Sequence, residues 1–218
     1  MQHGILITFE GIEGCGKSTQ ANRIFNYLLN SKYDVILTCE PGATKVGKII
    51  REILLSITNK NIDPYAELYL YLADRAQHLK EVIYPNYRDG KIIICDRYYY
   101  STVVYQGVAR NIGVETVELL HSVMPSFIKP NITFILDISV DESIRRTKKR
   151  IQEEKSNVFV RFELEERVFH ENIRQGYLEI LKRESPRVLI IDGMKDIDEI
   201  TAQIINYLKG FGIIKSDE

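Results

Sequence analysis

The sequence predicts an α/β fold in which a five-stranded parallel sheet carries helices on both of its faces. Five short runs rich in Ile, Val, Leu and Phe recur along the chain, and each run is apolar at successive positions. Continuous apolarity is typical of strands that are covered on both sides, as in a parallel sheet. The longer segments between the runs have helical periodicity, and this alternation favours parallel strands joined by helices.

The apolar runs are the expected strands, and they span residues 5–9, 35–39, 92–95, 132–138 and 188–191. Apolar residues three or four positions apart predict helices after the first strand, before the third strand and at the end of the chain. These residues are Ala21, Ile24, Phe25 and Leu28; Tyr65, Leu68, Tyr69 and Leu72; and Ile197, Ile200, Ile204 and Leu208.

Length and composition favour one globular domain. The chain has 218 residues, of which 44% are hydrophobic and 27% are charged. A chain of this size buries a core without needing disulfides or metals. No linker rich in Pro, Gly or Ser divides it, so we expect a single domain over residues 1–218 with a charged segment near residues 145–161.

Charge and hydropathy narrow the range of partners. The formal net charge is −1, so we expect no nucleic acid polymer as a partner. The apolar runs are far shorter than the roughly 20 residues of a membrane span, and the first residues have no leader pattern. We therefore expect a cytoplasmic protein without a membrane partner. Cys15, Cys39 and Cys95 lack paired spacing and are expected to be reduced residues that fill the core.

A glycine-rich loop follows the first predicted strand. Residues 11–18 have the sequence GIEGCGKS and match G-x-x-x-x-G-K-[ST] at every fixed position. Glycines let backbone N–H groups approach a polyphosphate, and the following helix directs its positive end at it. In this P-loop, Lys17 is expected to contact the β- and γ-phosphates and Ser18 to coordinate Mg²⁺. The predicted nucleotide-binding residues are Gly11, Ile12, Glu13, Gly14, Cys15, Gly16, Lys17, Ser18 and Thr19.

Two carboxylates are candidates for holding Mg²⁺ together with Ser18. Asp96 directly follows the third predicted strand, and Asp137 lies near the end of the fourth. Ligands of open parallel sheets bind at the carboxyl ends of the strands, where either residue could take part. We expect Asp96 to be the metal ligand and keep Asp137 as the competitor.

The P-loop alone does not separate a kinase from a switch GTPase or a motor, but further motifs do. They are ITFEGIEGCGKST, CEPGATKVGKIIRE, ELYLYLADRAQHL, IICDRYYYSTVVYQG, VRFELE and GYLEIL. Through these motifs the chain resembles the thymidylate kinase family from residue 5 to about residue 180. The resemblance implies a P-loop NTPase fold and transfer of the γ-phosphoryl group of ATP to dTMP. It also implies Mg²⁺ as a cofactor and a homodimer.

The resemblance further implies an acceptor site. Arg97 and Arg51 are suited to grip the acceptor phosphate, although each could instead form a surface ion pair. Tyr71 and Arg75 share one helical face, and the family's residues at these positions stack on thymine and bond its O4. From spacing alone Tyr71 would favour a core position. The remaining implied contacts are Thr102 and Gln106 at the base edge, Tyr105 where a 2′-hydroxyl would lie, and Glu13 at the 3′-hydroxyl.

A basic run forms the charged segment: Arg145, Arg146, Lys148, Lys149 and Arg150, with Arg161 further along. From the pattern alone this is a solvated helical face. A movable basic lid over ATP would instead surround the transferred phosphoryl group with cations. Family members without an arginine at the variable P-loop positions carry the catalytic arginine in the lid, and residues 12–15 contain none. The resemblance thus implies Arg150 as a catalytic residue beside Lys17 and Arg97.

Two residues depart from the family pattern. Cys39 stands where bacterial members usually have arginine, which removes a possible phosphate contact. Val160 stands where an aspartate usually precedes Arg161, which leaves Arg161 without its usual neighbour.

Two other functions remain as alternatives. A deoxynucleoside kinase is favoured by Glu40-Pro41, which resembles the general-base position of those enzymes. A switch GTPase is suggested by NKNID at residues 59–63, but Ile62 occupies the position where its guanine-binding pattern requires Asp. The basic residues Arg97 and Arg51 favour an acceptor that carries a phosphate, whose oxygen is already mostly ionised at neutral pH and needs no base.

Overall fold

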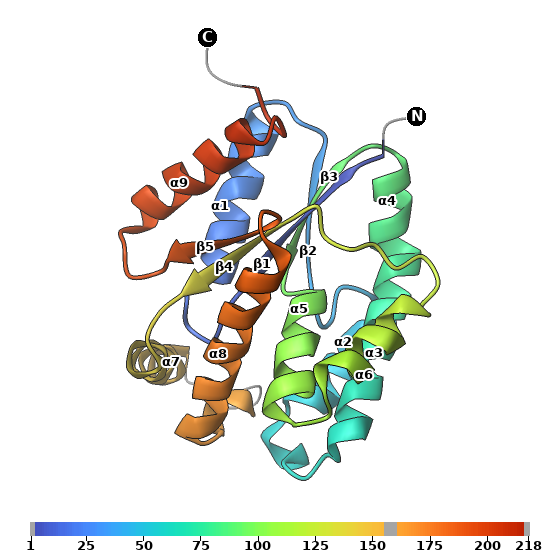
Figure 1. Ribbon diagram of the computed structural model, residues 1–218, viewed down its shortest axis with the longest axis vertical. Helices are drawn as coiled ribbons and strands as arrows, with labels where there is room; N and C mark the ends of the chain where they lie inside the picture. The colour runs from blue at the N-terminus through green and yellow to red at the C-terminus, as the bar shows by residue number, and fades with distance from the viewer. Residues whose placement is uncertain (1–2, 155–160, 216–218) are drawn as a thin grey trace.

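The five expected strands lie side by side in one parallel sheet (Figure 1). A computed structural model of the chain describes residues 3–154 and 161–215. The strands are β1 (Ile5–Glu10), β2 (Val35–Cys39), β3 (Ile92–Asp96), β4 (Ile132–Asp137) and β5 (Val188–Asp192). Their order is β2-β3-β1-β4-β5, and every neighbouring pair is parallel. The predicted fold class is confirmed.

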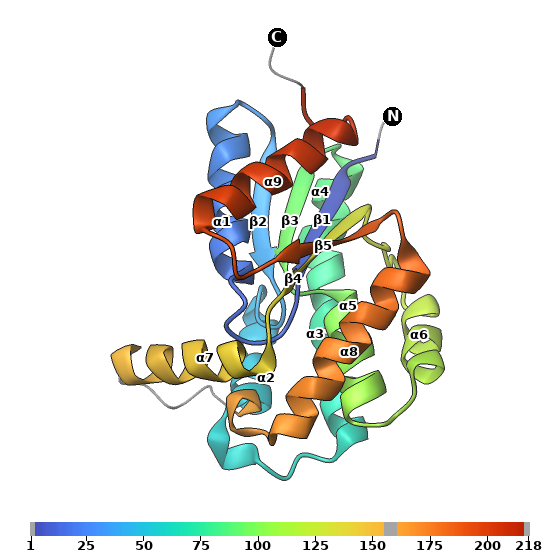
Figure 2. The same ribbon diagram turned by 60° about the vertical axis from the view of Figure 1, so that its left-hand side comes forward.

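Helices cover both faces of the sheet. Figures 1 and 2 show α1 (Lys17–Asn30) and α9 (Ile197–Gly210) together on one face, with α4 (Tyr84–Arg88) and α8 (Arg167–Glu184) on the other. The other α-helices are α2 (Lys45–Leu55), α3 (Pro64–His78), α5 (Tyr99–Thr102), α6 (Val114–Ser122) and α7 (Val140–Glu154). The described residues also contain two 3₁₀-helices, η1 (Ile57–Asn59) and η4 (Phe162–Leu164), and two π-helices, η2 (Leu79–Ile83) and η3 (Val103–Ala109). Within these residues no helix is long and apolar enough to cross a membrane.

The strand order creates a crevice at the carboxyl edge of the sheet. β1 lies in the centre, with β3 on one side and β4 on the other, so the direction of winding reverses at β1. Asp96 pairs with Phe9 on β1 and with Cys39 on β2, which aligns the ends of three strands. Open α/β sheets bind ligands at such a switch point. The P-loop follows β1 at this edge.

Local sequence explains where several helices begin. The carboxylate of Asp63 accepts from the backbone N–H groups of Tyr65 and Ala66 at 2.9 and 3.2 Å, and Pro64 occupies the first turn of α3. The hydroxyl of Thr44 accepts from Gly47 at 2.9 Å and caps α2 in the same way. Such caps satisfy backbone donors that the first helical turn leaves without partners.

The helix α3 buries less of its periodic pattern than the sequence alone would suggest. Leu68 is fully buried, whereas Tyr65 and Tyr69 from the same pattern are exposed. Val46, Ile49 and Ile53 of the neighbouring helix α2 are exposed as well. We call these five residues the α2–α3 apolar face. Amphipathic periodicity predicts which side of a helix is apolar, but it does not say what covers that side.

The basic run divides into an exposed part and a buried part. Residues 145–150 lie in α7, which extends away from the rest of the chain in Figure 2. Val160 lies outside the described residues. Arg161 is only 4% exposed, and its Nη2 donates to Oε2 of Glu67 at 2.6 Å. The solvated basic face therefore does not include Arg161, and a glutamate from α3 takes the place of the neighbour that Val160 cannot provide.

Candidate active site

The P-loop joins β1 to α1 with a backbone that suits a phosphate. Gly14 and Gly16 have φ values of 71° and 99°, in the left-handed region that favours glycine. A Cβ atom at Gly14 would also come within 3.2 Å of the Cβ atom of Arg146. No described side chain caps the first turn of α1. Its N–H groups therefore remain available to an anion, and the helix dipole adds positive potential there.

Lys17 is buried under the P-loop. Its Nζ donates to the carbonyl of Ile12 at 2.7 Å and lies 3.5 Å from the Sγ atom of Cys15. Among the described residues, no carboxylate lies within ion-pair distance of this ammonium group. An ammonium group has three donors, and an uncompensated buried charge is unfavourable. Lys17 is thus arranged to receive an anionic ligand.

Asp96 and Ser18 carry oxygen atoms of the kind that Mg²⁺ prefers as ligands. Ser18 Oγ donates to Oδ2 of Asp96, while Oδ1 of Asp96 is buried without a described partner. Both oxygens of the competitor Asp137 instead accept from Arg174, at 2.7 and 2.8 Å. In the described part of the chain, no group of three or more His, Cys, Asp or Glu could hold a metal ion. A magnesium ion at Asp96 would therefore take its further ligands from phosphate oxygens and water.

Arg97 connects the P-loop to η3. Its φ of 64° is rare for arginine, and such strain often accompanies a functional constraint. Nη2 donates to Oε1 of Glu13 at 2.9 Å, and Nη1 donates to the carbonyl of Gly11 at 3.1 Å and to Ser101 Oγ at 3.2 Å. The hydroxyl of Tyr105 donates to the same Oε1 atom at 2.5 Å. The ion-pair partner of Arg97 is therefore Glu13 rather than its sequence neighbour Asp96.

The carboxylate of Glu13 is held in its ionised form. Burial alone would raise its pKa, but Arg97, His170 and Lys17 hold the pKa well below its ordinary value. His170 Nδ1 lies 3.6 Å from Oε2 of Glu13, and neither atom has a hydrogen-bond partner among the residues that the structure describes. Burial lowers the pKa of His170, but Glu13 outweighs that effect and raises it. An ionised carboxylate accepts hydrogen bonds only, which suits a sugar hydroxyl as its donor.

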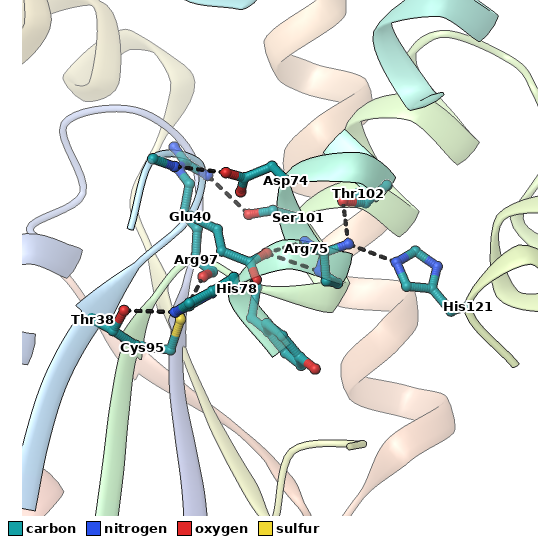
Figure 3. Close-up of polar contacts among 12 residues, drawn as sticks. Thr38, Glu40, Asp74, Arg75, His78, Cys95, Arg97, Ser101, Thr102 and His121 are labelled. Carbon is teal, nitrogen blue, oxygen red and sulfur yellow. Dashed lines mark hydrogen bonds and ion pairs between the residues drawn. The ribbon is translucent and has the colours of Figure 1, made fainter. Parts of the chain in front are cut away.

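Arg75 belongs to a buried polar network (Figure 3). Its Nε and Nη2 donate to Oε2 of Glu40 at 2.8 and 2.5 Å, and its Nη1 donates to Oγ1 of Thr102 at 2.8 Å. His78 contacts the other oxygen of Glu40 at 2.8 Å. Burial would raise the pKa of Glu40, but Arg75 and His78 lower it. Glu40 therefore fixes Arg75 in place and is poorly suited to act as a general base.

One cavity of about 750 Å³ connects the P-loop with the Arg75 network. The expected site residues that line it are Glu13, Gly14, Gly16, Lys17, Ser18, Thr19, Arg51, Tyr71, Arg75, Asp96, Arg97, Thr102, Tyr105, Gln106 and Arg150. Gly11, Ile12 and Cys15 are buried behind this lining. Cys39 lines the cavity at the open end of β2 and is exposed, so the prediction that it fills the core is wrong.

Two expected contacts, Arg51 and Tyr71, line the cavity, and neither forms an ion pair or hydrogen bond with a described carboxylate. Arg51 Nη1 donates to the carbonyl of Pro41 at 2.8 Å, and no described carboxylate forms an ion pair with it. Burial raises the pKa of Tyr71, so its ring carries a neutral hydroxyl. Both side chains are therefore available to a ligand in the cavity.

Helix α7 reaches the cavity through Arg146 and, closer to the end of the helix, Arg150. Nη2 of Arg150 donates to Oε1 of Glu163 at 2.6 Å, and both of these residues line the cavity. The side chain of Arg150 remains 45% exposed, whereas that of Glu163 is only 10% exposed. Glu163 thus holds a partly solvated arginine at the edge of the site.

Sequence reasoning missed several buried groups that support the site. Glu10 accepts from the backbone of Tyr98 and from the hydroxyls of Ser101 and Tyr177. Glu67, beneath the cavity wall, accepts from Gln106 at 2.7 Å. An acidic residue at the end of an apolar strand, such as Glu10, is a signal that could have been used, whereas no local pattern marks Glu67.

Comparison with known proteins gives one consistent result. The family model described as Thymidylate kinase matches residues 9–204. A thymidylate kinase of Geotalea daltonii is 41% identical over 212 residues, which cover 95% of this chain and 99% of that relative. A thymidylate kinase of Sulfurihydrogenibium sp. is 43% identical over 211 residues, with 97% and 100% coverage. The crystal structure of thymidylate kinase from Ehrlichia chaffeensis has a TM-score of 0.75 and 30% identity, and the match covers 95% of this chain and 99% of that one.

Proposed function

This chain belongs to the thymidylate kinase family, and from that premise we propose which of its residues transfer the γ-phosphoryl group of ATP to dTMP. The observation that carries the proposal is one cavity that is lined by the P-loop, by the buried Arg75 and by the half-buried Arg97. Phosphoryl transfer requires the two nucleotides to meet in line, and a shared cavity supports such an encounter. The products are dTDP and ADP.

The donor half of the site consists of the P-loop and the lid. Backbone N–H groups from Gly11 to Thr19 bind the phosphates of ATP, and Lys17 neutralises charge on the β- and γ-phosphates. We place the lid at residues 145–161, of which 155–160 lie outside the described residues, in a single domain that spans residues 1–218. Arg150 moves from Glu163 onto the transferred group. Positive groups aimed at charge that develops in the transition state are the main source of rate acceleration in this chemistry.

The acceptor half binds dTMP. Arg97 and Arg51 hold its phosphate, and Tyr71 stacks on thymine while Arg75 donates to O4. Glu13 accepts from the 3′-hydroxyl, and Tyr105 packs at C2′. Thr102 and Gln106 complete the contacts to the base edge. The hydrogen bonds from Arg97 and Tyr105 to the same oxygen of Glu13 support this arrangement, because they hold three of these groups in fixed relative positions.

The acceptor phosphate acts as its own nucleophile. A phosphate monoester with a second pKa near 6 is mostly dianionic at neutral pH, so no general base is needed. A deoxynucleoside kinase, by contrast, must activate a sugar hydroxyl. The ion pair of Glu40 with Arg75 and its hydrogen bond with His78 argue against that alternative, since they occupy the carboxylate that would have to serve as the base.

The acceptor preference tests this function directly. ADP release should be measured with dTMP, dUMP, thymidine and GMP as separate acceptors. We expect dTMP to exceed dUMP in kcat/KM by roughly 10–200-fold, the range that one methyl group in a fitted pocket supplies. Thymidine should remain near background because it has no phosphate for Arg97 and Arg51. Efficient use of thymidine would favour a deoxynucleoside kinase, and ADP release without any acceptor would favour a different class of P-loop protein.

We propose that Ser18 and Asp96 hold Mg²⁺ together with the ATP phosphates. The unpartnered Oδ1 atom of Asp96 beside the hydroxyl of Ser18 supports this donor set. When bound, the ion neutralises charge on the phosphate oxygens. Asp96→Asn should therefore abolish most of the gain in ATP affinity that Mg²⁺ gives the wild type. Calorimetric titration of ATP with Mg²⁺ and with EDTA checks this, and an undiminished gain in the variant would exclude Asp96. Asp137→Asn is the matched control and should retain the gain.

We also propose a homodimer that forms through the α2–α3 apolar face. Five large apolar side chains, Val46, Ile49, Ile53, Tyr65 and Tyr69, are exposed on two neighbouring helices, which supports a covered surface there. Ile49→Asp should shift the mass measured by light scattering from two chains toward one. Leu119→Asp, at an exposed leucine of α6, is the control. A wild-type protein that is monomeric at micromolar concentration would contradict the proposal.

A cytoplasmic location is the remaining proposal about this enzyme. All three cysteines are free thiols, which is typical of a reducing compartment where ATP and dTMP are also found. Fractionation of the source cells with an antibody against the chain would test it, and recovery in an extracellular fraction would contradict it.

A further inference from the structure

A fully buried carboxylate lies behind the base-binding wall of the cavity. Glu67, in the first turn of α3, has no exposed surface and does not line the cavity. Its Oε1 accepts from Nε2 of Gln106 at 2.7 Å, and its Oε2 accepts from Nη2 of Arg161 at 2.6 Å. Arg110 donates to the two oxygens at 3.2 and 3.3 Å. Glu67 therefore connects a residue of the cavity wall to two arginines outside it.

The contact with Glu67 determines which way the amide of Gln106 points. A carboxylate accepts hydrogen bonds and donates none, so Gln106 must present its nitrogen to Glu67. The opposite orientation would bring two acceptor oxygens together at a buried position, which is strongly unfavourable. Gln106 lines the cavity, and no described donor contacts its carbonyl oxygen Oε1. The wall therefore offers an acceptor at this position.

The neighbouring residues Arg75 and Thr102 offer donors. Two of the five N–H groups of Arg75 bind Glu40, and two from Nη1 bind Thr102 and His121, the latter at 2.6 Å. Burial and the charge of Arg75 lower the pKa of His121 to about 3, so this imidazole is neutral. Its Nδ1–H donates to the carbonyl of Val117 at 2.7 Å, which leaves Nε2 as an acceptor for Arg75.

This count leaves a single N–H on Nη2 of Arg75 for a ligand. Thr102 accepts from Arg75 through its oxygen, so the hydroxyl hydrogen is free to donate. The wall thus presents two donors beside one acceptor. A base with a ring carbonyl next to a ring N–H complements this pattern, whereas a base with an amino group next to an unprotonated ring nitrogen opposes it at every contact.

We propose that Glu67 is a positioning residue that fixes the Gln106 amide with its oxygen toward the base and thereby makes the site reject 4-aminopyrimidine nucleotides. The inference rests on the proposed function, because it concerns the acceptor site of the same reaction. Arg161 and Arg110, which both donate to Oε2 of Glu67, hold the carboxylate in the position that this role requires. Arg161 is itself held by the carbonyl of Leu54 at 2.5 Å, and Arg110 by Glu165 at 2.5 Å, so Glu67 cannot turn away from Gln106.

The ratio of kcat/KM for dTMP to that for dCMP tests the inference, because this ratio does not depend on the fraction of folded enzyme. Glu67→Gln replaces the carboxylate by an amide that can donate or accept, so Gln106 becomes free to present either end. We expect the ratio to fall about tenfold or more, since the wild type avoids leaving a buried polar group unsatisfied only with the thymine base. Glu67→Asp keeps a negative charge for both arginines, but the shorter side chain places the carboxylate farther from Gln106. It should lower the ratio even if Glu67→Gln fails to fold.

Two controls separate this role from a purely structural one. Glu165→Gln changes a carboxylate of the same network that contacts Arg110 but not Gln106, and its ratio should stay within about twofold of the wild type. In a Gln106→Ala background, Glu67→Gln should cause no further change, because the residue through which it acts is gone.

An unchanged ratio in both Glu67 variants would overturn the inference, and so would an equal fall in the Gln106→Ala background. Lower melting temperature with an unchanged ratio would mean that Glu67 only supports the fold. Failure of the wild type to phosphorylate dTMP would instead contradict the proposed function, so the two failures are distinguishable.

Discussion

Replacing Lys17 with alanine is expected to reduce phosphoryl transfer by about 10²–10³-fold at saturating ATP and dTMP, the loss typical for one positive or donor group at the transition state. Lys17 Nζ contacts only the Ile12 carbonyl and the Cys15 thiol among the described groups, so its charge is not committed to an ion pair. Turnover should fall far more than ATP affinity, because charge on the transferred group develops as the reaction proceeds.

The fold should survive this substitution. Lys17 is not part of the hydrophobic core, and the P-loop backbone is set by the glycines that precede it, Gly11, Gly14 and Gly16. Thermal unfolding followed by circular dichroism provides the check. Lys182→Ala, which removes an exposed lysine paired with Glu179 on α8, is the matched control and should keep full turnover. Turnover of the Lys17 variant within a few fold of the wild type would contradict the role proposed for Lys17.

The sheet and the P-loop could be predicted because their signals are local. Each strand is a continuous apolar run that is nearly complete in itself, and the observed bounds differ from the expected ones by no more than one residue. The P-loop is recognisable because three glycines, a lysine and a serine occur within eight residues. Hydrophobic periodicity and backbone requirements act over such short distances, so the sequence expresses them directly.

The partners of the charged residues could not be predicted, because they come from distant parts of the chain. Arg161 was expected to lack an acidic neighbour, yet Glu67 stands 94 positions away in sequence and 2.6 Å away in space. Glu40 resembled a general base until its contacts with Arg75, 35 positions along, became visible. A pattern can identify a charged residue, but only tertiary structure decides which opposite charge it meets.

The solvent exposure of residues at the ends and edges of helices and strands could not be predicted either, because it too depends on tertiary structure. Cys39 is the last residue of β2, where the sheet opens into the cavity, and it is exposed although its strand is apolar. Tyr65 and Tyr69 share a periodic pattern with the buried Leu68 but lie on a side of α3 that the described residues leave uncovered. Periodicity therefore identified the elements correctly, but not the surroundings of their outermost residues.

Replacing Arg150 with alanine is expected to lower turnover by roughly 10³-fold or more, the scale known for an arginine that stabilises the transition state of phosphoryl transfer. No arginine occupies the variable positions 12–15 of the P-loop, and the family resemblance implies that an arginine of the lid then supplies the cation. Arg150 lines the cavity, and its bond to Glu163 leaves the side chain 45% exposed and able to exchange that partner for a phosphate oxygen. Binding of ATP and dTMP should change little.

The chain offers a control on the same helix. Among the described residues Arg145 pairs only with Glu142; its side chain is 66% exposed and does not line the cavity. Arg145→Ala removes the same charge from the same lid, so a loss of turnover below about twofold is expected. A comparable loss in both variants would mean that the lid acts through its overall charge, and small losses in both would leave α7 as a solvated face.

Arg161→Ala should lower stability more than turnover, the opposite of Arg150→Ala. This contrast decides which of the two arginines contacts the transferred phosphoryl group. Arg161 is buried against Glu67 and the carbonyl of Leu54, and it does not line the cavity. Breaking a buried ion pair costs up to about 3–5 kcal/mol, and here less, because Arg110 still contacts Glu67. The Arg161 variant should therefore melt at a lower temperature while turnover at a permissive temperature falls less than for Arg150→Ala. Steady-state rates and melting curves of the two variants provide the test. A greater loss of turnover at Arg161 would assign the transition-state contact to that residue, because a buried structural arginine affects stability before it affects chemistry.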